Sequence, residues 1–255
     1  NALIDLSKET FTDDFINQLE SLIGLENLDY VITNHMEPDH SGALLRLREL
    51  APQAKFLGMN KAVAMMKDFY GIDQNVEVLK HEQTLSLGRN TLKFIYTPFV
   101  HWPETMMTYM VEEKILFSCD GFGSFGCLDG VLFDDETSDQ GFYEREALRY
   151  YTNIIAAFSK HVLQALEKLS AYEINIVAPS HGLVWRKDPG RIISLYKYWA
   201  SLATERAESG VTVLYGTMYR NTERALEHAL QALASENVPV EVFNVGLTDP
   251  SYILP

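Results

Sequence analysis

The amino-acid sequence predicts a mixed α/β fold, and three features of its 255 residues support this class. Short runs of β-branched and aromatic residues alternate with longer segments in which apolar residues recur at helical spacing. Turn-forming residues separate these segments along most of the chain. Hydrophobic residues make up 47% of the sequence, which is enough to bury a substantial core. At this length we expect one large domain, or one domain and part of another.

Residues 1–208 are expected to form the first domain. Its strands are short and apolar, and we expect them over 1–6, 28–33, 55–58, 76–79, 84–87, 91–96, 106–111, 114–118 and 174–178. Its helices carry apolar residues three and four positions apart, and we expect them over 41–50, from Asn60 onward, over 142–170 and over 189–208. In the first of these helices, the buried side is expected to hold Leu44, Leu45, Leu47 and Leu50.

Residues 210–255 are expected to begin a second domain. A strand over 211–215 leads into a polar turn over 216–222, and a helix over 223–235 follows. A second strand is expected over 240–245, with Pro239 just ahead of it, where a missing N–H does least harm. The segment therefore predicts one βαβ unit.

Composition limits the classes of partner. The net charge of −14 argues against a nucleic-acid or anionic-membrane partner, because few cations are free to neutralise phosphates. No apolar run approaches the ~18 residues of a membrane span, and the start lacks the features of a signal peptide. Only Cys119 and Cys127 are present, and they make neither a disulfide framework nor a zinc ribbon. The cytoplasm is the expected compartment.

Metal-binding residue types follow an apolar strand in the pattern H-x-E-x-D-H. The pattern is made by His35, Glu37, Asp39 and His40, and later apolar segments end at His101, Asp120 and His181. A single histidine or aspartate at a strand end is usually a cap or a satisfied polar residue. Seven in this order favour metal ligation instead. In an extended stretch, residues 35, 37 and 39 would point to the same side.

Three carboxylates and four imidazoles are enough to hold two metal ions side by side. Hard carboxylates together with imidazole suit iron or manganese at least as well as zinc. We expect Asp120 to lie between the ions as a bridging ligand. Two ions held about 3.5–4 Å apart can clamp a small bridging substrate.

With these residues the chain resembles the flavodiiron proteins, which are oxygen or nitric oxide reductases. The run Trp102-Pro103-Glu104-Thr105 also matches the family at that point. Zinc hydrolases of the same superfamily carry H-x-H-x-D-H, whereas this chain has Glu37 in place of the second histidine. The resemblance implies a metallo-β-lactamase-like αββα sandwich, followed by the first βαβ of a flavodoxin-like doubly wound domain.

The resemblance also assigns the ligands. One iron would take His35, Glu37, His101 and Asp120, and the second would take Asp39, His40, Asp120 and His181. In some members His40 lies near the metal without binding it, so its role stays open. The first strand or two of the metal domain are expected to precede Asn1. Tyr150 and Tyr151 are candidates for a tyrosine that lines the substrate pocket, and Tyr150 is preferred.

FMN is the expected cofactor of the second domain. The FMN phosphate would lie at the turn before the helix, on Thr217, Tyr219, Arg220, Asn221 and Thr222. Flavodoxins usually have Gly where this chain has Arg220, which would either add a cation or crowd the turn. The loops that cover the flavin ring would lie beyond Pro255, so we expect this chain to bind FMN weakly or not at all.

The function implied is reduction of O2 to water, of NO to N2O, or of both, with electrons delivered through FMN from a donor such as rubredoxin. A head-to-tail homodimer is implied as well. Two alternatives remain: a dizinc hydrolase, which Glu37 disfavours, and a non-catalytic diiron protein that senses oxygen. The sequence leaves open the preferred substrate and the donor. The acidic run 134–136 is expected to be a solvated loop.

Overall fold

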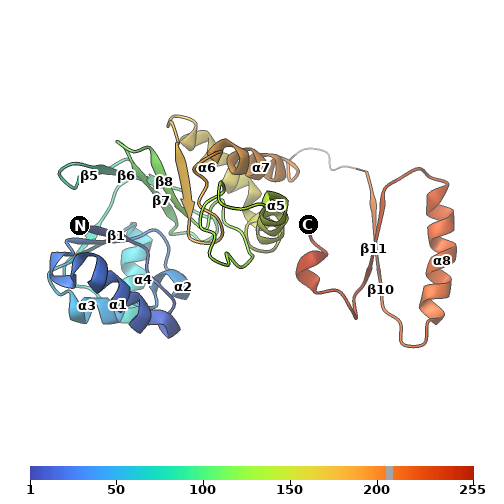
Figure 1. The fold of residues 1–255 in the computed structure, drawn as a ribbon, viewed down its shortest axis with the longest axis horizontal. Coiled ribbons are helices and arrows are strands. Elements are labelled where there is room, and N and C mark those ends of the chain that lie inside the picture. Colours follow the sequence, from blue (N-terminus) through green and yellow to red (C-terminus); the bar gives the residue numbers. More distant parts are fainter. Residues whose placement is uncertain (205–208) are drawn as a thin grey trace.

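The computed structural model describes residues 1–204 and 209–255. Two sheets are packed between two groups of helices, and a smaller unit follows toward the C-terminus (Figure 1). The predicted mixed α/β class and the αββα arrangement are confirmed. No helix in the described part of the chain is long and apolar enough to cross a membrane.

The first sheet has four parallel strands in the order β1-β2-β3-β4. Their bounds are β1 Ala2–Ile4, β2 Tyr30–Thr33, β3 Lys55–Gly58 and β4 Val76–Val78. Parallel strands need crossover connections, which here contain helices α1 Thr12–Ile23, α2 Pro38–Ser41, α3 Leu44–Leu50 and α4 Asn60–Tyr70. Helix α1 was not predicted from the sequence, although Ile16 and Leu19 are its buried residues at helical spacing.

The second sheet has five strands in the order β5-β6-β7-β8-β9, antiparallel except for the parallel pair β8 and β9. Their bounds are β5 Thr84–Ser86, β6 Thr91–Tyr96, β7 Met106–Met110, β8 Ile115–Cys119 and β9 Ile176–Pro179. The predicted strands are present, with β9 shifted by two residues at its start. The helices that pack against this sheet are α5 Gln140–Tyr150, α6 Ser159–Leu169 and α7 Pro189–Ser201.

The period of two in β6 divides the hydrophobic core into two clusters. Leu92 and Phe94 join the cluster that also contains the buried faces of α1, α3 and α4. Ile95 points the other way and joins the cluster formed by α5, α6 and α7. The second sheet is therefore buried on both faces.

Three expected helical segments differ in detail from those observed. The helix expected over 41–50 is two helices, because α2 ends at Ser41 and α3 begins at Leu44. Leu45 and Leu50 are 49% and 37% exposed, so their expected burial was wrong. The helices expected over 142–170 are α5 and α6, with π and 3-10 turns between them over Tyr151–Ile155 and Ala156–Phe158. Helix α7 ends at Ser201, and the remainder of the helix expected up to 208 lies partly outside the described residues.

The C-terminal unit is a parallel pair of strands with one helix between them. Its elements are β10 Val211–Tyr215, α8 Asn221–Ala234 and β11 Val240–Asn244. The expected βαβ unit is present; its assignment as part of a separate domain stays a prediction. The unit returns to α5 at its end (Figure 1). There Arg149 donates hydrogen bonds to the hydroxyls of Ser251 and Tyr252, at 2.9 Å each.

Candidate metal centre

The loop that follows β2 begins the centre. His35 is fully buried beyond the end of the strand, and the chain stays extended at Glu37 with φ −60° and ψ 144°. Pro38 then starts α2, because its fixed φ suits the first position of a helix. Asp39 and His40 therefore lie on a helical turn. The expectation that residues 35, 37 and 39 point to one side was wrong for Asp39, since the helix turns its carboxylate toward a second group of ligands.

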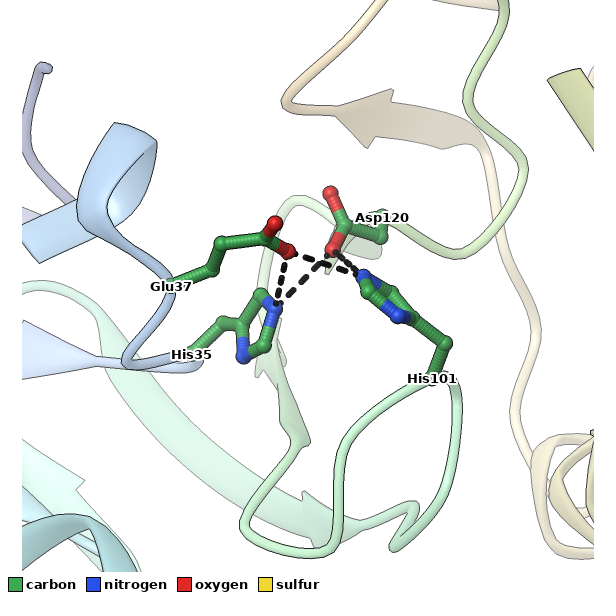
Figure 2. A group of neighbouring side chains, drawn as sticks. All are labelled: His35, Glu37, His101 and Asp120. Carbon is green, nitrogen blue, oxygen red and sulfur yellow. Dashed lines mark hydrogen bonds and ion pairs between the residues drawn. The ribbon is translucent and has the colours of Figure 1, made fainter. Parts of the chain in front are cut away.

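The first group contains His35, Glu37, His101 and Asp120, and one potential ligand atom of each lies within 4.8 Å of the others. Figure 2 shows His35 and Glu37, from one loop, converging with His101 and Asp120, which come from two other segments. Nε2 of His35 lies 3.2 Å from Oε2 of Glu37 and 3.3 Å from Oδ2 of Asp120. Nε2 of His101 lies 3.0 and 3.1 Å from the same two oxygens.

The second group contains Asp39, His40 and His181, again within 4.8 Å of one another. Nε2 of His181 lies 3.3 Å from Oδ2 of Asp39, and Nε2 of His40 lies 3.7 Å from Oδ1 of the same aspartate. The rings of His40 and His181 meet edge to face at 5.3 Å. His40 is 2% exposed, whereas about a third of the side-chain surface of Asp39 and of His181 is exposed.

Asp120 lies between the two groups, at the end of β8. Its Oδ2 faces the first group, at 3.1 Å from His101, and its Oδ1 faces the second, at 3.0 Å from His40 and 3.2 Å from His181. The carboxylate is 1% exposed. One side chain thus presents one oxygen to each group, which is the geometry of a bridging ligand.

Opposite charges move the pKa values of the centre. Burial lowers the pKa of His35, but Glu104 and the neighbouring carboxylates outweigh burial and raise it to about 9. Burial also lowers the pKa of His181, which nearby carboxylates raise to about 9. Burial raises the pKa of Asp120, but contacts with three imidazoles hold it well below its ordinary range. The carboxylate of Asp120 therefore stays charged and attracts positive charge, carried either by protons or by metal ions.

Several buried atoms of the centre lack a hydrogen-bond partner of good geometry. They are both carboxylate oxygens of Asp120, Oδ1 of Asp39 and Nε2 of His40. An unsatisfied buried polar group costs about 1–3 kcal/mol. Cations bound in the two groups would satisfy all of these atoms, and carboxylate with imidazole suits iron, manganese or zinc. The residues present therefore fit a pair of metal ions.

Three residues behind the histidines were not predicted from the sequence as parts of the centre. Glu104 accepts a hydrogen bond from Nδ1 of His35 at 2.7 Å. Asp5 lies 3.8 Å from Nδ1 of His40, and Sγ of Cys119 lies 3.6 Å from the same nitrogen. The matching run at 102–105 was the only signal for Glu104.

The segment after β8 fixes His181 through the backbone. The N–H of Ser124 donates to the carbonyl oxygen of His181 at 3.1 Å. Gly182 adopts a φ of +83°, and a Cβ there would lie 1.9 Å from Oγ of Ser124. Glycine is required at this position both by the backbone conformation and by the close approach of Ser124.

The structure distinguishes the two candidate tyrosines. Tyr150 lies beside the centre, with its ring centroid 5.8 Å from that of His181. Burial, and then the charge of Asp120, raise its pKa well above the ordinary value, so its hydroxyl keeps its proton. Tyr151 lies in the core instead, where its hydroxyl is hydrogen-bonded to that of Ser159 at 2.6 Å.

The turn expected to bind the FMN phosphate lies between β10 and α8. Arg220 adopts the left-handed conformation that Gly would favour, with a φ of 63°, and its Nε donates to Glu223 at 2.7 Å. Tyr219 is 82% exposed. Helix α8 begins at Asn221, and none of the side chains that the structure describes caps it. The N–H groups of its first turn are therefore open to an anion.

Comparison with known proteins adds an independent observation. A family model described as "ODP family beta lactamase" matches residues 1–182. The chain belongs to this family. The match includes all seven candidate metal ligands, from His35 to His181.

Individual relatives point the same way. The chain is 35% identical to a nitric oxide reductase from Moorella thermoacetica, over 99% of this chain and 63% of the relative. Among solved structures, it resembles a flavo di-iron protein mutant from Thermotoga maritima, with a TM-score of 0.89 and 31% identity over 100% of this chain and 63% of that one. It also resembles the rubredoxin oxygen:oxidoreductase from Desulfovibrio gigas, with a TM-score of 0.90 and 26% identity over 99% of this chain and 63% of that one.

These matches confirm the resemblance to flavodiiron proteins. The chain spans less than two thirds of the length of the curated relatives that it matches.

Proposed function

We propose that this chain carries a non-haem diiron centre and belongs to an oxidoreductase of the flavodiiron type, which reduces O2 to water, NO to N2O, or both. The observation that carries the proposal is the division of seven side chains into two ligand groups joined by Asp120. The reductases among its relatives support the reaction class.

We assign the first iron to His35, Glu37, His101 and Asp120, and the second to Asp39, His40, Asp120 and His181. Support for His40 comes from its Nε2, which is buried, makes no hydrogen bond of good geometry and lies 3.0 Å from the shared carboxylate. Glu37 favours iron over zinc, because it contributes a hard anionic ligand where the related hydrolases have an imidazole. When bound, the two ions would supply electrons and adjacent binding positions to a diatomic substrate.

The protein's own groups control access and protons. Glu37, Asp39 and His181 each expose about a third of their side-chain surface, so a small gas can reach the centre. Both proposed reactions consume one proton for each electron. Tyr150 is buried beside His181 and retains its hydroxyl proton, so we assign it the role of hydrogen-bond donor to the bound substrate.

Electrons are proposed to arrive through FMN, in a flavodoxin-like domain to which residues 210–255 contribute. We assign the FMN phosphate to the turn that contains Thr217, Tyr219, Arg220, Asn221 and Thr222. The uncapped start of α8 supports this assignment. The pairing of Arg220 with Glu223 means that its charge is already partly compensated. A rubredoxin-like donor, a head-to-tail homodimer and a cytoplasmic location are parts of the same proposal.

Anaerobic metal analysis tests the proposal. The chain, reconstituted with Fe(II) and Zn(II) supplied together, should retain two irons, and the chemically reduced protein should consume O2 or NO. Two bound zinc ions, together with turnover of an ester or phosphoester, would favour the hydrolase alternative instead. Metal binding without consumption of either gas would favour the oxygen sensor.

A further inference from the structure

Glu104 is a buried acid that the ligand set does not include. It lies in the loop between β6 and β7, and its side chain is completely buried. Its Oε1 accepts two hydrogen bonds, from Nδ1 of His35 at 2.7 Å and from the backbone N–H of Met36 at 3.1 Å. Glu104 thus holds both the ring of His35 and the backbone that follows it.

The first of these bonds determines which nitrogen of His35 can bind a metal. A carboxylate only accepts hydrogen bonds, so the shared proton lies on Nδ1. Nε2 is therefore the nitrogen that a cation can bind, in place of the proton that this atom otherwise carries. This nitrogen lies 3.2 Å from Oε2 of Glu37 and 3.3 Å from Oδ2 of Asp120, inside the first ligand group.

The same loop also limits rotation of the ring. Trp102 packs edge to face against His35, with ring centroids 5.1 Å apart and an interplanar angle of 87°. His35 is fully buried, so water offers no alternative partner for either nitrogen. The aromatic contact restricts where the ring lies, and the carboxylate fixes which edge faces the centre.

The negative charge of Glu104 indicates more than a structural acceptor. Its Oε2 is buried without a hydrogen-bond partner, which is a costly arrangement for a carboxylate. A neutral acceptor would satisfy the N–H of Met36 equally well. The charge has an effect on His35, because a carboxylate behind a ligating imidazole makes its far nitrogen a stronger donor.

We propose that Glu104 is a positioning residue of the first metal position: it holds His35 with Nε2 toward the ligand group and strengthens that nitrogen as a ligand. This inference rests on the proposed function only in assuming that the group binds a metal. Glu104 itself contacts neither ion nor substrate.

Cobalt binding tests the inference separately from the choice between iron and zinc. Wild type, Glu104→Gln and Glu104→Ala are titrated with Co(II) against a competing chelator, and the two binding constants are measured for each. Glu104→Gln keeps an acceptor and loses the charge, so it should lower the affinity for one Co(II) ion by about 10-fold. Glu104→Ala should lower the affinity for the same ion by about 100-fold. The other constant should stay within about threefold of wild type.

Two further measurements separate positioning from general stability. The proton on Nδ1 of His35 should give a downfield imidazole N–H signal by NMR, which is kept in Glu104→Gln and lost in Glu104→Ala. Asp134→Asn is the matched control, because Asp134 is also a buried acid but accepts its hydrogen bonds from the backbone N–H groups of Arg186, Lys187 and Asp188 and not from a ligating histidine. It should lower the urea midpoint and leave both cobalt constants unchanged.

The inference is overturned if Glu104→Ala binds both ions as wild type does. It is also overturned if the affinities for both ions fall equally and in proportion to the loss of folding stability, since that would indicate a purely structural role. A preference of wild type for zinc over iron would contradict the proposed function and leave this inference standing.

Discussion

Asp5 connects the end of β1 to the centre through a hydrogen bond from the backbone N–H of Asn34 to its Oδ1, at 2.7 Å. Its other oxygen lies 3.8 Å from Nδ1 of His40. The backbone is tied at the same place, because the N–H of Leu6 donates to the carbonyl oxygen of His40 at 2.9 Å. The first strand therefore supports the loop that carries four of the seven proposed ligands.

Replacing Asp5 should destabilise the fold in a graded way. Asp5→Ala leaves the buried N–H of Asn34 unpaired and should cost about 1–3 kcal/mol in urea unfolding. Asp5→Asn keeps the accepting oxygen and should cost less. The control is Glu77→Ala, which removes an exposed ion pair with Lys55 and should change stability by at most about 1 kcal/mol. Equal midpoints for Asp5→Ala and Glu77→Ala would contradict this expectation.

Asp120 and His181 should differ in how many ions they affect. Asp120→Ala removes an oxygen from each group, so metal analysis should find that both ions are lost. His181→Ala removes one imidazole from the second group and should mainly weaken the binding of one ion. His228→Ala, at an exposed position on α8, should leave the metal content unchanged. Retention of one tightly bound ion by Asp120→Ala would argue against its bridging role.

Glu37→His should shift metal preference toward zinc. The change removes a hard anionic ligand and recreates the H-x-H-x-D-H pattern of the related hydrolases. Competition between Fe(II) and Zn(II), measured on both proteins, provides the test. An unchanged preference would mean that residues around the ligands, rather than Glu37, select the metal.

Stability should fall in acid partly through Asp134. Burial raises the pKa of this carboxyl, but three backbone N–H groups outweigh burial and lower the pKa from 3.8. A lowered folded pKa stabilises the protein above the unfolded value, and this contribution disappears as pH falls through the folded value. Asp134→Asn places an amide donor against one backbone N–H and should cost about 1–3 kcal/mol at pH 7.

The difference in unfolding free energy between wild type and Asp134→Asn should become smaller when urea unfolding is repeated at about pH 3 and below. A difference that stays constant between neutral and acidic pH would show that the charge of Asp134 contributes nothing. The same carboxyl corrects an expectation from the sequence: the run 134–136 is not uniformly solvated, because Asp134 is only 4% exposed.

Local patterns were sufficient for most strands and for naming the proposed ligands. Each ligand follows an apolar segment, and strand ends meet at sheet edges, so the order of residue types along the chain carried the information. The placement of Asp39 and His35 in different ligand groups was not predictable in this way. It depends on Pro38 starting a helix, which changes the side-chain period within three residues.

Supporting residues were harder to find, because their roles depend on distant contacts. Glu104 and His35 are 69 positions apart, and Asp5 and Asn34 are 29 apart. Neither acid lies in a pattern that identifies its partner. Helix α1 was missed for a different reason: only Ile16 and Leu19 are buried in its twelve residues, so its apolar face is narrow.

Gly182 has a consequence for any attempt to move this centre into another protein. Its missing side chain leaves room for Ser124, whose N–H holds the carbonyl oxygen of His181. A graft that copied only the seven proposed ligands would carry His181 without the backbone that aims it. The smallest transplantable unit therefore includes Gly182 and Ser124, although neither is among the proposed ligands.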